Sequence, residues 1–258
     1  MRIRQIRQNQ SWNQSISVVV NGPSLDLKRL PSDSELFCVN QFCLSDEFEK
    51  RRPKFYMFLD PRYADKSSHD SSFYKAVDAL NKKTIWSLVL FIPRHFTNSI
   101  APRVDNANIQ ICAYELTPFP AVELPTPLRP FLYDTALMTP PASNVLVHAL
   151  YIAIHLGFRN VDLHGADMNF FQGVTRSNSG ALSFRRNHFY GVEDVPLDMS
   201  MTQFFQEQYQ NFSAFKDLAD TTRRRGIKVT NHSSSSMIDA FDIVEPSPES
   251  DAAHSSRA

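Results

Sequence analysis

Four polar side chains stand just past short apolar runs, where chemistry on a bound ligand could take place. They are Asn21 in VVVN, Asn40 in FCVN, Asp60 in MFLD and Asp167 in LHGAD. Taken singly, each residue is typical of a turn or a helix cap. In doubly wound sheets, however, ligands bind outside the carboxyl ends of the strands. Four polar residues after four predicted strands therefore favour a cleft for a polar ligand.

The NGPS turn after the first run indicates what kind of ligand the cleft would take. It contains one glycine, Gly22, where the dinucleotide fingerprint needs three, and no Walker sequence occurs in the chain. The turn offers instead the Asn21 amide, the Ser24 hydroxyl and the start of a predicted helix. Such a set can bind a single phosphate together with sugar hydroxyls or a base edge. We therefore expect a mononucleotide portion in the ligand.

Composition excludes several other classes of protein. The chain has 258 residues, and its 27 Lys and Arg balance 27 Asp and Glu, which argues against a nucleic-acid partner. Three cysteines are too few to staple the fold and favour a reducing, cytoplasmic compartment. The longest apolar runs, such as WSLVLFI, are too short to span a membrane, and the first residues lack a signal-peptide pattern. We expect a soluble protein and leave open a peripheral contact with the inner membrane.

Strand-like and helix-like segments alternate along the chain. Short apolar runs predict strands at 16–20, 35–39, 54–59, 84–91, 109–113, 161–164 and 227–230. Helices are predicted around 70–82, at 143–157 with Ser143 as N-cap, and at 201–225. Continuous apolar runs of this kind suit a parallel sheet that is covered on both faces. The fold class is therefore α/β, with a doubly wound, mostly parallel, Rossmann-like sheet.

Two segments do not fit the alternation. Residues 115–142 carry seven prolines, and we interpret them as a long surface connection. Residues 168–200 are polar and aromatic, and we interpret them as an inserted lid without regular structure. The expected organisation is an N-terminal extension at 1–14, a single catalytic domain at 15–242 that carries the lid, and a disordered tail at 243–258.

The order of the motifs resembles the bacterial sialyltransferases of glycosyltransferase family 42. The resemblance spans 16 to about 242 and rests on NGPSL, RLPSDSELFCVNQF, FLDP, LGFRNVDLHGADMNF, HFY and GIKVTNHSSSSMIDAF. It implies a GT-A variant of the fold and inverting transfer of sialic acid, or a related nonulosonic acid, from a CMP-activated donor to a sugar hydroxyl of a surface glycan such as lipooligosaccharide. It also implies a homo-oligomer that needs no metal and no cofactor. The NGPS turn occurs as well in flagellin-modifying accessory proteins and in an archaeal pterin pyrophosphokinase. A related pyrophosphokinase or a non-catalytic nucleotide-binding protein therefore remains the alternative.

The resemblance assigns roles to individual residues. The family's general base corresponds to His188 in RRNHFYG, and a neutral imidazole is suited to taking a proton from a sugar hydroxyl. Three of the other seven histidines have structural interpretations: His148 and His155 lie at a polar or half-buried edge of one helix, and His164 lies in the core. The implied donor site consists of Asn21, Ser24, Asn40, Gln41, Asp60, Ser143, Gly165, Asp167, Met168 and Asn169.

The sequence departs from the family at two places. Asp60 stands where the family has an asparagine, and a carboxylate there would repel a phosphate. The two tyrosines that stabilise the leaving CMP in the family have no counterpart in GADMNFFQGVTRSNSG. The candidates to replace them are Asn169 and three lid arginines, namely Arg176, Arg185 and Arg186. No His/Cys spacing suggests zinc and no D-x-D pair occurs in nucleotide context, so we predict that no metal takes part.

Overall fold

The computed structural model describes residues 3, 6, 14–65, 71–117, 124–125, 127–176, 178, 180–188 and 191–244. Within the lid, the side chains of residues 186–188 and 193 lie outside the described part. His188 and Arg186 are therefore placed by their backbone alone. Most of the predicted extension and tail also falls outside the described residues.

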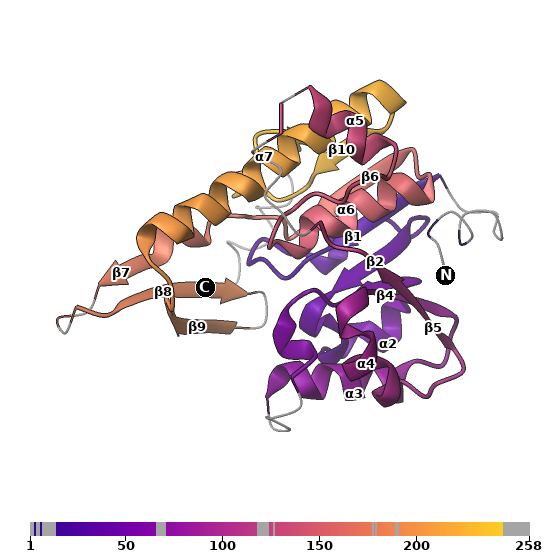
Figure 1. The fold of residues 1–258 in the computed structure, drawn as a ribbon. Helices are drawn as coiled ribbons and strands as arrows, with labels where there is room; N and C mark the ends of the chain where they lie inside the picture. Colours follow the sequence, from indigo (N-terminus) through magenta and orange to yellow (C-terminus); the bar gives the residue numbers. More distant parts are fainter. Residues whose placement is uncertain are drawn as a thin grey trace, which may run out of the picture.

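An eight-stranded sheet forms the centre of the molecule (Figure 1). Its order is β11-β10-β6-β1-β2-β3-β4-β5, and every neighbouring pair is parallel. The strands are β1 (Ser15–Val19), β2 (Glu35–Val39), β3 (Phe55–Met57), β4 (Leu88–Pro93), β5 (Ile109–Tyr114), β6 (Asn160–His164), β10 (Lys228–Asn231) and β11 (Asp242–Ile243). The chain proceeds one way from β1 to β5 and then returns to β6 on the other side of β1. This reversal confirms the predicted doubly wound fold, with its switch point between β1 and β6.

Helices cover both faces of the sheet, as the apolar runs predicted. One face packs against α5 (Leu128–Asp134), α6 (Val145–Leu156) and α7 (Met201–Arg225). The other packs against α2 (Glu47–Arg51), α3 (Ser72–Lys83) and α4 (Thr97–Ile100). Figure 1 shows these two groups on opposite sides of the strands. None of the helices in the described part of the chain is long and apolar enough to cross a membrane.

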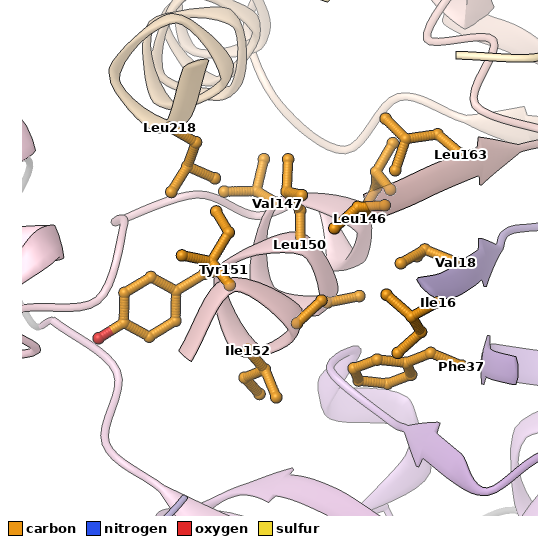
Figure 2. Close-up of a cluster of buried hydrophobic side chains, with 14 of the residues drawn as sticks. Ile16, Val18, Phe37, Leu146, Val147, Leu150, Tyr151, Ile152, Leu163 and Leu218 are labelled. Carbon is orange, nitrogen blue, oxygen red and sulfur yellow. The ribbon is translucent and has the colours of Figure 1, made fainter. Parts of the chain in front are cut away.

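Alternate residues of each strand enter the two cores. Ile16 and Val18 of β1, with Phe37 of β2, pack under α6, whereas Val19 joins the core beneath α3. In Figure 2, Leu150 of α6 lies between these side chains and Leu218 of α7. Burying a large aliphatic side chain contributes about 1.5–3 kcal/mol. The apolar runs therefore fix both the strands and the position of α6 over the switch point.

The boundaries of α6 follow from its caps. Asn144 Oδ1 accepts a hydrogen bond of 2.8 Å from the backbone N–H of Leu146, so the N-cap is Asn144 and not the predicted Ser143. The helix ends at Gly157, whose φ of 95° suits a residue without a Cβ. His148 and His155 are both buried, which corrects the prediction of a polar or half-buried edge. Each uses Nε2 to bond a backbone carbonyl at 2.9 Å.

The proline-rich segment contains a helix that the sequence reading missed. Helix α5 occupies 128–134, and the buried Arg129 on it forms an ion pair of 3.2 Å with Asp217 of α7. Pro130 lies in the first turn of α5, where a missing N–H breaks no helical hydrogen bond. Residues 115–142 are therefore more than a surface connection, because α5 packs against α7.

The lid also contains regular structure that was not predicted. Three antiparallel strands, β7 (Val174–Arg176), β8 (Leu182–His188) and β9 (Gly191–Pro196), form a separate small sheet. Figure 1 shows this sheet standing beside the main body, next to the first half of α7. Helix α7 begins with a capping box between Ser200 and Gln203 and matches the predicted 201–225.

The buried histidine on α6 predicts a pH-dependent stability. Burial lowers the pKa of His148 to about 4, against 6.5 for an exposed imidazole. Because the folded protein binds this proton more weakly than the unfolded chain does, protonation of His148 favours unfolding. The free energy of unfolding is therefore unaffected by His148 above pH 6.5 and decreases as the pH falls toward 4. Replacing His148 with Gln, which can still bond the Ala142 carbonyl, should reduce this loss by up to about 3 kcal/mol.

Urea unfolding of both proteins at pH 7 and pH 4.5 measures this difference. The comparison with the wild type is needed because burial raises the pKa of Asp217 to about 6, which favours the folded state as the pH falls. If both proteins lose the same free energy of unfolding, the buried imidazole is not the source of the pH dependence.

Candidate functional site

A cleft of about 810 Å³ lies at the carboxyl ends of the central strands. Its walls come from the loops after β1, β2, β3, β4 and β6, from the start of α6, from α7 and from the lid. The lining includes Asn21, Gly22, Asn40, Asp60, Arg62, His95, Ser143, Asn144, Gly165, Asp167, Met168, Asn169, Phe170, Phe184, Asp198, Phe204, Glu207, Gln208 and Asn211. A ligand in this cleft would therefore contact the switch point, two helices and the small sheet together.

Most of the predicted donor-binding residues line this one cleft. The structure brings together Asn21, Asn40, Asp60, Ser143, Gly165, Asp167, Met168 and Asn169. Ser24 and Gln41 are half-buried next to it and are not among the lining residues. The segment after the NGPS turn contains the 3-10 turn η1 (Leu27–Arg29) and no α-helix, so the helix start that reaches the cleft is that of α6.

Asp167 joins three segments that are distant in sequence. One carboxylate oxygen, Oδ2, accepts a hydrogen bond of 3.0 Å from the backbone N–H of Ser24. The other oxygen accepts one from the Ser235 hydroxyl, and the Asp167 carbonyl accepts one of 2.8 Å from the N–H of Met237. The carboxylate therefore connects the NGPS turn and the serine-rich segment after β10. Its contribution to the cleft is first of all to position these loops.

Two glycines permit the close approach of the loops after β1 and β6. The backbone N–H of Gly22 donates to the carbonyl of Gly165 at 3.0 Å. A Cβ on Gly22 would lie 2.1 Å from Asp167 Oδ2 and 2.2 Å from the Gly165 carbonyl oxygen. Gly165 has a φ of +69°, and a Cβ there would lie 2.4 Å from the carbonyl oxygen of Val20. No larger residue fits at either position without moving a loop.

Asn40 adopts a backbone conformation that few residue types tolerate. Its φ is 55°, in the left-handed region where asparagine is favoured among residues with a side chain. The buried Tyr56 hydroxyl donates to the Asn40 carbonyl at 2.6 Å and accepts from the N–H of Cys43 at 2.8 Å. Asn40 Oδ1 is buried and has no hydrogen-bond partner among the described residues. The strained turn thus holds the Asn40 amide at the cleft, where its Oδ1 can accept a hydrogen bond from a ligand.

Asp60 is paired with a neighbouring arginine. Its carboxylate accepts from Nε of Arg62 at 3.0 Å and from Nη2 at 2.6 Å. The guanidinium in turn lies 3.9 Å from the centre of the Phe73 ring. The negative charge of Asp60 is therefore compensated within the site, which offsets the repulsion that its carboxylate would exert on a phosphate.

The start of α6 is tied to α7 and to the loop after β6. Asn144 donates from its backbone N–H to Oδ1 of Asn211 at 3.2 Å, and Asn211 donates from Nδ2 to the Ser143 hydroxyl at 3.3 Å. The Asn144 amide also donates to the sulfur of Met168, a residue with a φ of 51°. These bonds fix the helix N-terminus at the cleft wall, where its dipole favours an anion.

The lid arginines Arg176 and Arg185 are not among the residues that line the cleft. Arg185 forms an exposed ion pair with Asp194 at 3.0 Å, and Arg176 is exposed on β7. The side chains of Arg186 and His188 are outside the described part. The backbone of His188 pairs with that of Gly191. His188 follows the cleft-lining Phe184 by four residues on β8, and four residues span roughly 13 Å along a strand.

Several lining residues were missed by the sequence reading. Arg62 and His95 follow β3 and β4 within the motifs DPR and IPRH, so their position after a strand could have indicated them. Glu207, Gln208 and Asn211 come from the middle of α7, where helical spacing alone does not reveal which face meets a cleft.

His164 has the structural environment that was predicted for it. It is buried at the end of β6, and its ring stacks on that of His232 with centroids 4.7 Å apart. Burial, with a smaller effect of His232, lowers the pKa of His164 to about 4. A neutral, buried imidazole of this kind suits packing more than proton transfer. Among the described residues, no cluster of His, Cys, Asp and Glu has the arrangement to hold a metal ion.

Comparison with known proteins finds similarity in fold. No protein-family model matches the chain, and no curated protein sequence matches it. The monofunctional alpha-2,3-sialyltransferase Cst-I from Campylobacter jejuni is similar over 96% of each chain, with 15% identity and a TM-score of 0.46. An alpha-2,3-sialyltransferase from Campylobacter jejuni in apo form is similar over 90% of this chain and 80% of that one, with 18% identity and a TM-score of 0.45. Similarity at this level concerns the fold and does not by itself identify an activity.

The contact between the two glycine loops predicts the effect of a single methyl group. Replacing Gly22 with Ala should lower the free energy of unfolding by about 1–3 kcal/mol, because the new Cβ overlaps Asp167 and the Gly165 carbonyl. The exposed Lys28 of the same loop, replaced with Ala, serves as the control and should change the free energy of unfolding little. Urea denaturation of the three proteins measures this. Equal stability of the Gly22 variant and the control would mean that the loops separate without loss.

Proposed function

We propose that the protein is an inverting glycosyltransferase that transfers sialic acid, or a related nonulosonic acid, from a CMP-activated donor to a sugar hydroxyl of a glycan. The observation that supports this most is the clustering of the motif residues. Eight of the ten residues that the family resemblance assigns to the donor line one cleft at the switch point of the sheet. A doubly wound sheet binds its ligand at this place.

In this proposal the nucleotide lies along the loops after β1 and β2. The amides of Asn21 and Asn40 are neutral and carry both donors and acceptors, so they can recognise a base or ribose without repelling a phosphate. The phosphate lies toward the N-terminus of α6, which Asn144 and Asn211 hold in place. The Asp60–Arg62 pair adds no net negative charge beside it.

The transfer step uses groups on either side of the sugar. The acceptor oxygen attacks the anomeric carbon as the bond from that carbon to the phosphate oxygen breaks, and CMP leaves with the electron pair. In the proposal, the acceptor proton passes to the imidazole of His188 on β8. Asn169, which lines the cleft, and the N-terminus of α6 are the groups that stabilise the departing phosphate in this proposal.

Nucleotide selectivity tests the proposed donor. CMP should stabilise the wild type against heat more than UMP or GMP does, and at one hundred times its dissociation constant it adds roughly 2.7 kcal/mol. Replacing Asn40 with Gly removes the amide and also suits the positive φ, so binding should weaken while stability is kept. The exposed Asn98, replaced with Ala, is the control. Stabilisation by GMP or ATP in place of CMP would refute the proposal, and metal-dependent turnover would favour the pyrophosphokinase alternative.

The role of the predicted base is tested by comparing two histidines. His188→Ala should leave the affinity for CMP unchanged and lower turnover by about 10²–10⁴-fold, the usual effect of removing a general base. His164→Ala should lower stability, because a buried ring is lost, while the folded fraction keeps its turnover. Steady-state kinetics and thermal unfolding of both variants separate the two roles. Equal losses of turnover would remove the assignment of His188, and CMP binding without any donor turnover would favour a non-catalytic nucleotide-binding protein.

A further inference from the structure

The ionisable groups around the cleft are divided between its two sides. The side formed by the strand ends carries His95 after β4 and Arg62 after β3, and the charge of Arg62 is matched by Asp60. The positive end of the α6 dipole also lies on this side, near β1. On the opposite side, α7 and the chain leading into it contribute Glu207 and Asp198. Helix α7 packs on α5, α6 and β10, which is separated from β3 by β6, β1 and β2. Within the described lining, the α7 side of the cleft therefore carries acidic groups and no cation.

One face of α7 forms this wall. Phe204, Glu207, Gln208 and Asn211 follow each other at helical spacing and all line the cleft. Asn211 is held by the start of α6, and the Phe204 ring meets that of Phe170 edge-on with centroids 6.2 Å apart. The wall is therefore rigid and reaches from the proposed phosphate position toward the lid.

The amide next to the carboxylate is also set up to accept hydrogen bonds. Nε2 of Gln208 donates to the Phe204 carbonyl at 3.4 Å, and this fixes which end of the amide is the donor. Gln208 Oε1 is buried and has no partner within the described part of the chain. A buried acceptor left without a hydrogen bond lowers the stability of the folded protein. A hydroxyl or N–H of a ligand would remove this cost once it reaches the amide.

Glu207 has neither an ion-pair nor a hydrogen-bond partner among the described side chains. The other ionisable residues of the lining are Asp60, Arg62, His95, Asp167 and Asp198. Of these, Asp60 and Arg62 are paired with each other and Asp167 bonds Ser24 and Ser235. Partial burial raises the pKa of Glu207, because no cation offsets the loss of water around its carboxylate. Such a group accepts hydrogen bonds from hydroxyls and repels anions.

We propose that this face of α7 is the acceptor subsite and that Glu207 makes it select a neutral, hydroxyl-rich sugar over an acidic one. The inference rests on the proposed glycosyltransferase function. A neutral pyranose presents hydroxyls to Glu207 and Gln208 and its apolar face to Phe204. A uronic acid in the same place brings a second carboxylate next to Glu207, and this like-charge contact acts as the rejecting element.

Matched pairs of acceptors test the inference. Methyl β-galactoside and methyl β-glucoside are compared with the corresponding methyl uronides, which differ only by a carboxylate in place of the CH₂OH group. CMP-sialic acid is the donor, and kcat/KM is measured for each acceptor with the wild type, Glu207→Gln and Glu49→Gln. The glutamine keeps the shape of the side chain and loses its charge. Glu49 is exposed on α2, away from the cleft, and is the matched control.

The wild type and the Glu49 variant should both prefer the neutral acceptors by at least tenfold. In Glu207→Gln the ratio of acidic to neutral kcat/KM should rise by at least tenfold. An unchanged ratio in Glu207→Gln overturns the inference. A wild type that prefers the uronides also overturns the inference. The same holds if the wild type hydrolyses the donor but transfers to none of the four acceptors.

Hydrolysis of the donor in water by the wild type tests the proposed function separately. If the wild type neither hydrolyses nor transfers, the proposed function fails, and the inference is then judged by binding alone. Saturation-transfer NMR with the CMP-loaded protein should detect the neutral glycosides with the wild type and the uronides only with Glu207→Gln. Equal binding of both classes to the wild type would overturn the selectivity assigned to Glu207.

Discussion

The cleft depends on the carboxylate of Asp167 and on the two glycines that let it reach its partners. Hydrogen bonds to a charged group contribute about 1.5–3 kcal/mol each, and Asp167 accepts one from the NGPS turn and one from the serine-rich segment after β10. These bonds form because Gly22 and Gly165 let two loops approach until the Gly22 nitrogen lies 3.0 Å from the Gly165 carbonyl oxygen. With a side chain at either position, the loops after β1 and β6 would separate and the switch point would lose its shape. Asn21 directly precedes Gly22, and Asn169 follows Asp167 by two residues, so the positions of both depend on this contact.

The sheet and the helices contribute differently to the site. The loops after β1 and β2 supply amides on short, strained turns, of which Asn40 with its φ of 55° is the clearest case. Helix α7 supplies a wall whose side chains are fixed by packing and by Asn211. A mononucleotide needs directional polar contacts, whereas a sugar ring needs an apolar face and a few acceptors. The division of the cleft into a strand-end side and a helical side therefore matches the two parts of a nucleotide-sugar reaction.

The sequence predicted the central fold well because its signals are local. Runs such as SISVV and ELFCV are short and mostly apolar, and such runs suit buried strands of a parallel sheet. The lid strands were missed because LSFRRNH and GVEDVP are polar and pair mainly with each other, so no apolar period marks them. Helix α5 was missed because Pro130 reads as a breaker although the first helical turn tolerates it. In the site, residues after strands were found from their position, but Glu207 and Gln208 required knowledge of how α7 packs.

The place of β1 in the sheet has a consequence for how the chain is made. β1 pairs with β2 soon after synthesis begins, but its other edge pairs with β6, and the contact between Ser24 and Asp167 joins residues 143 positions apart. Until β6 leaves the ribosome, an apolar, β-branched edge has no neighbour and is open to pairing with other chains. Closing so long a segment is slow, since the entropy of the loop is lost before its contacts form. The cleft therefore takes its shape late in folding, and a chain truncated before β6 would carry the NGPS turn without the loop that positions it.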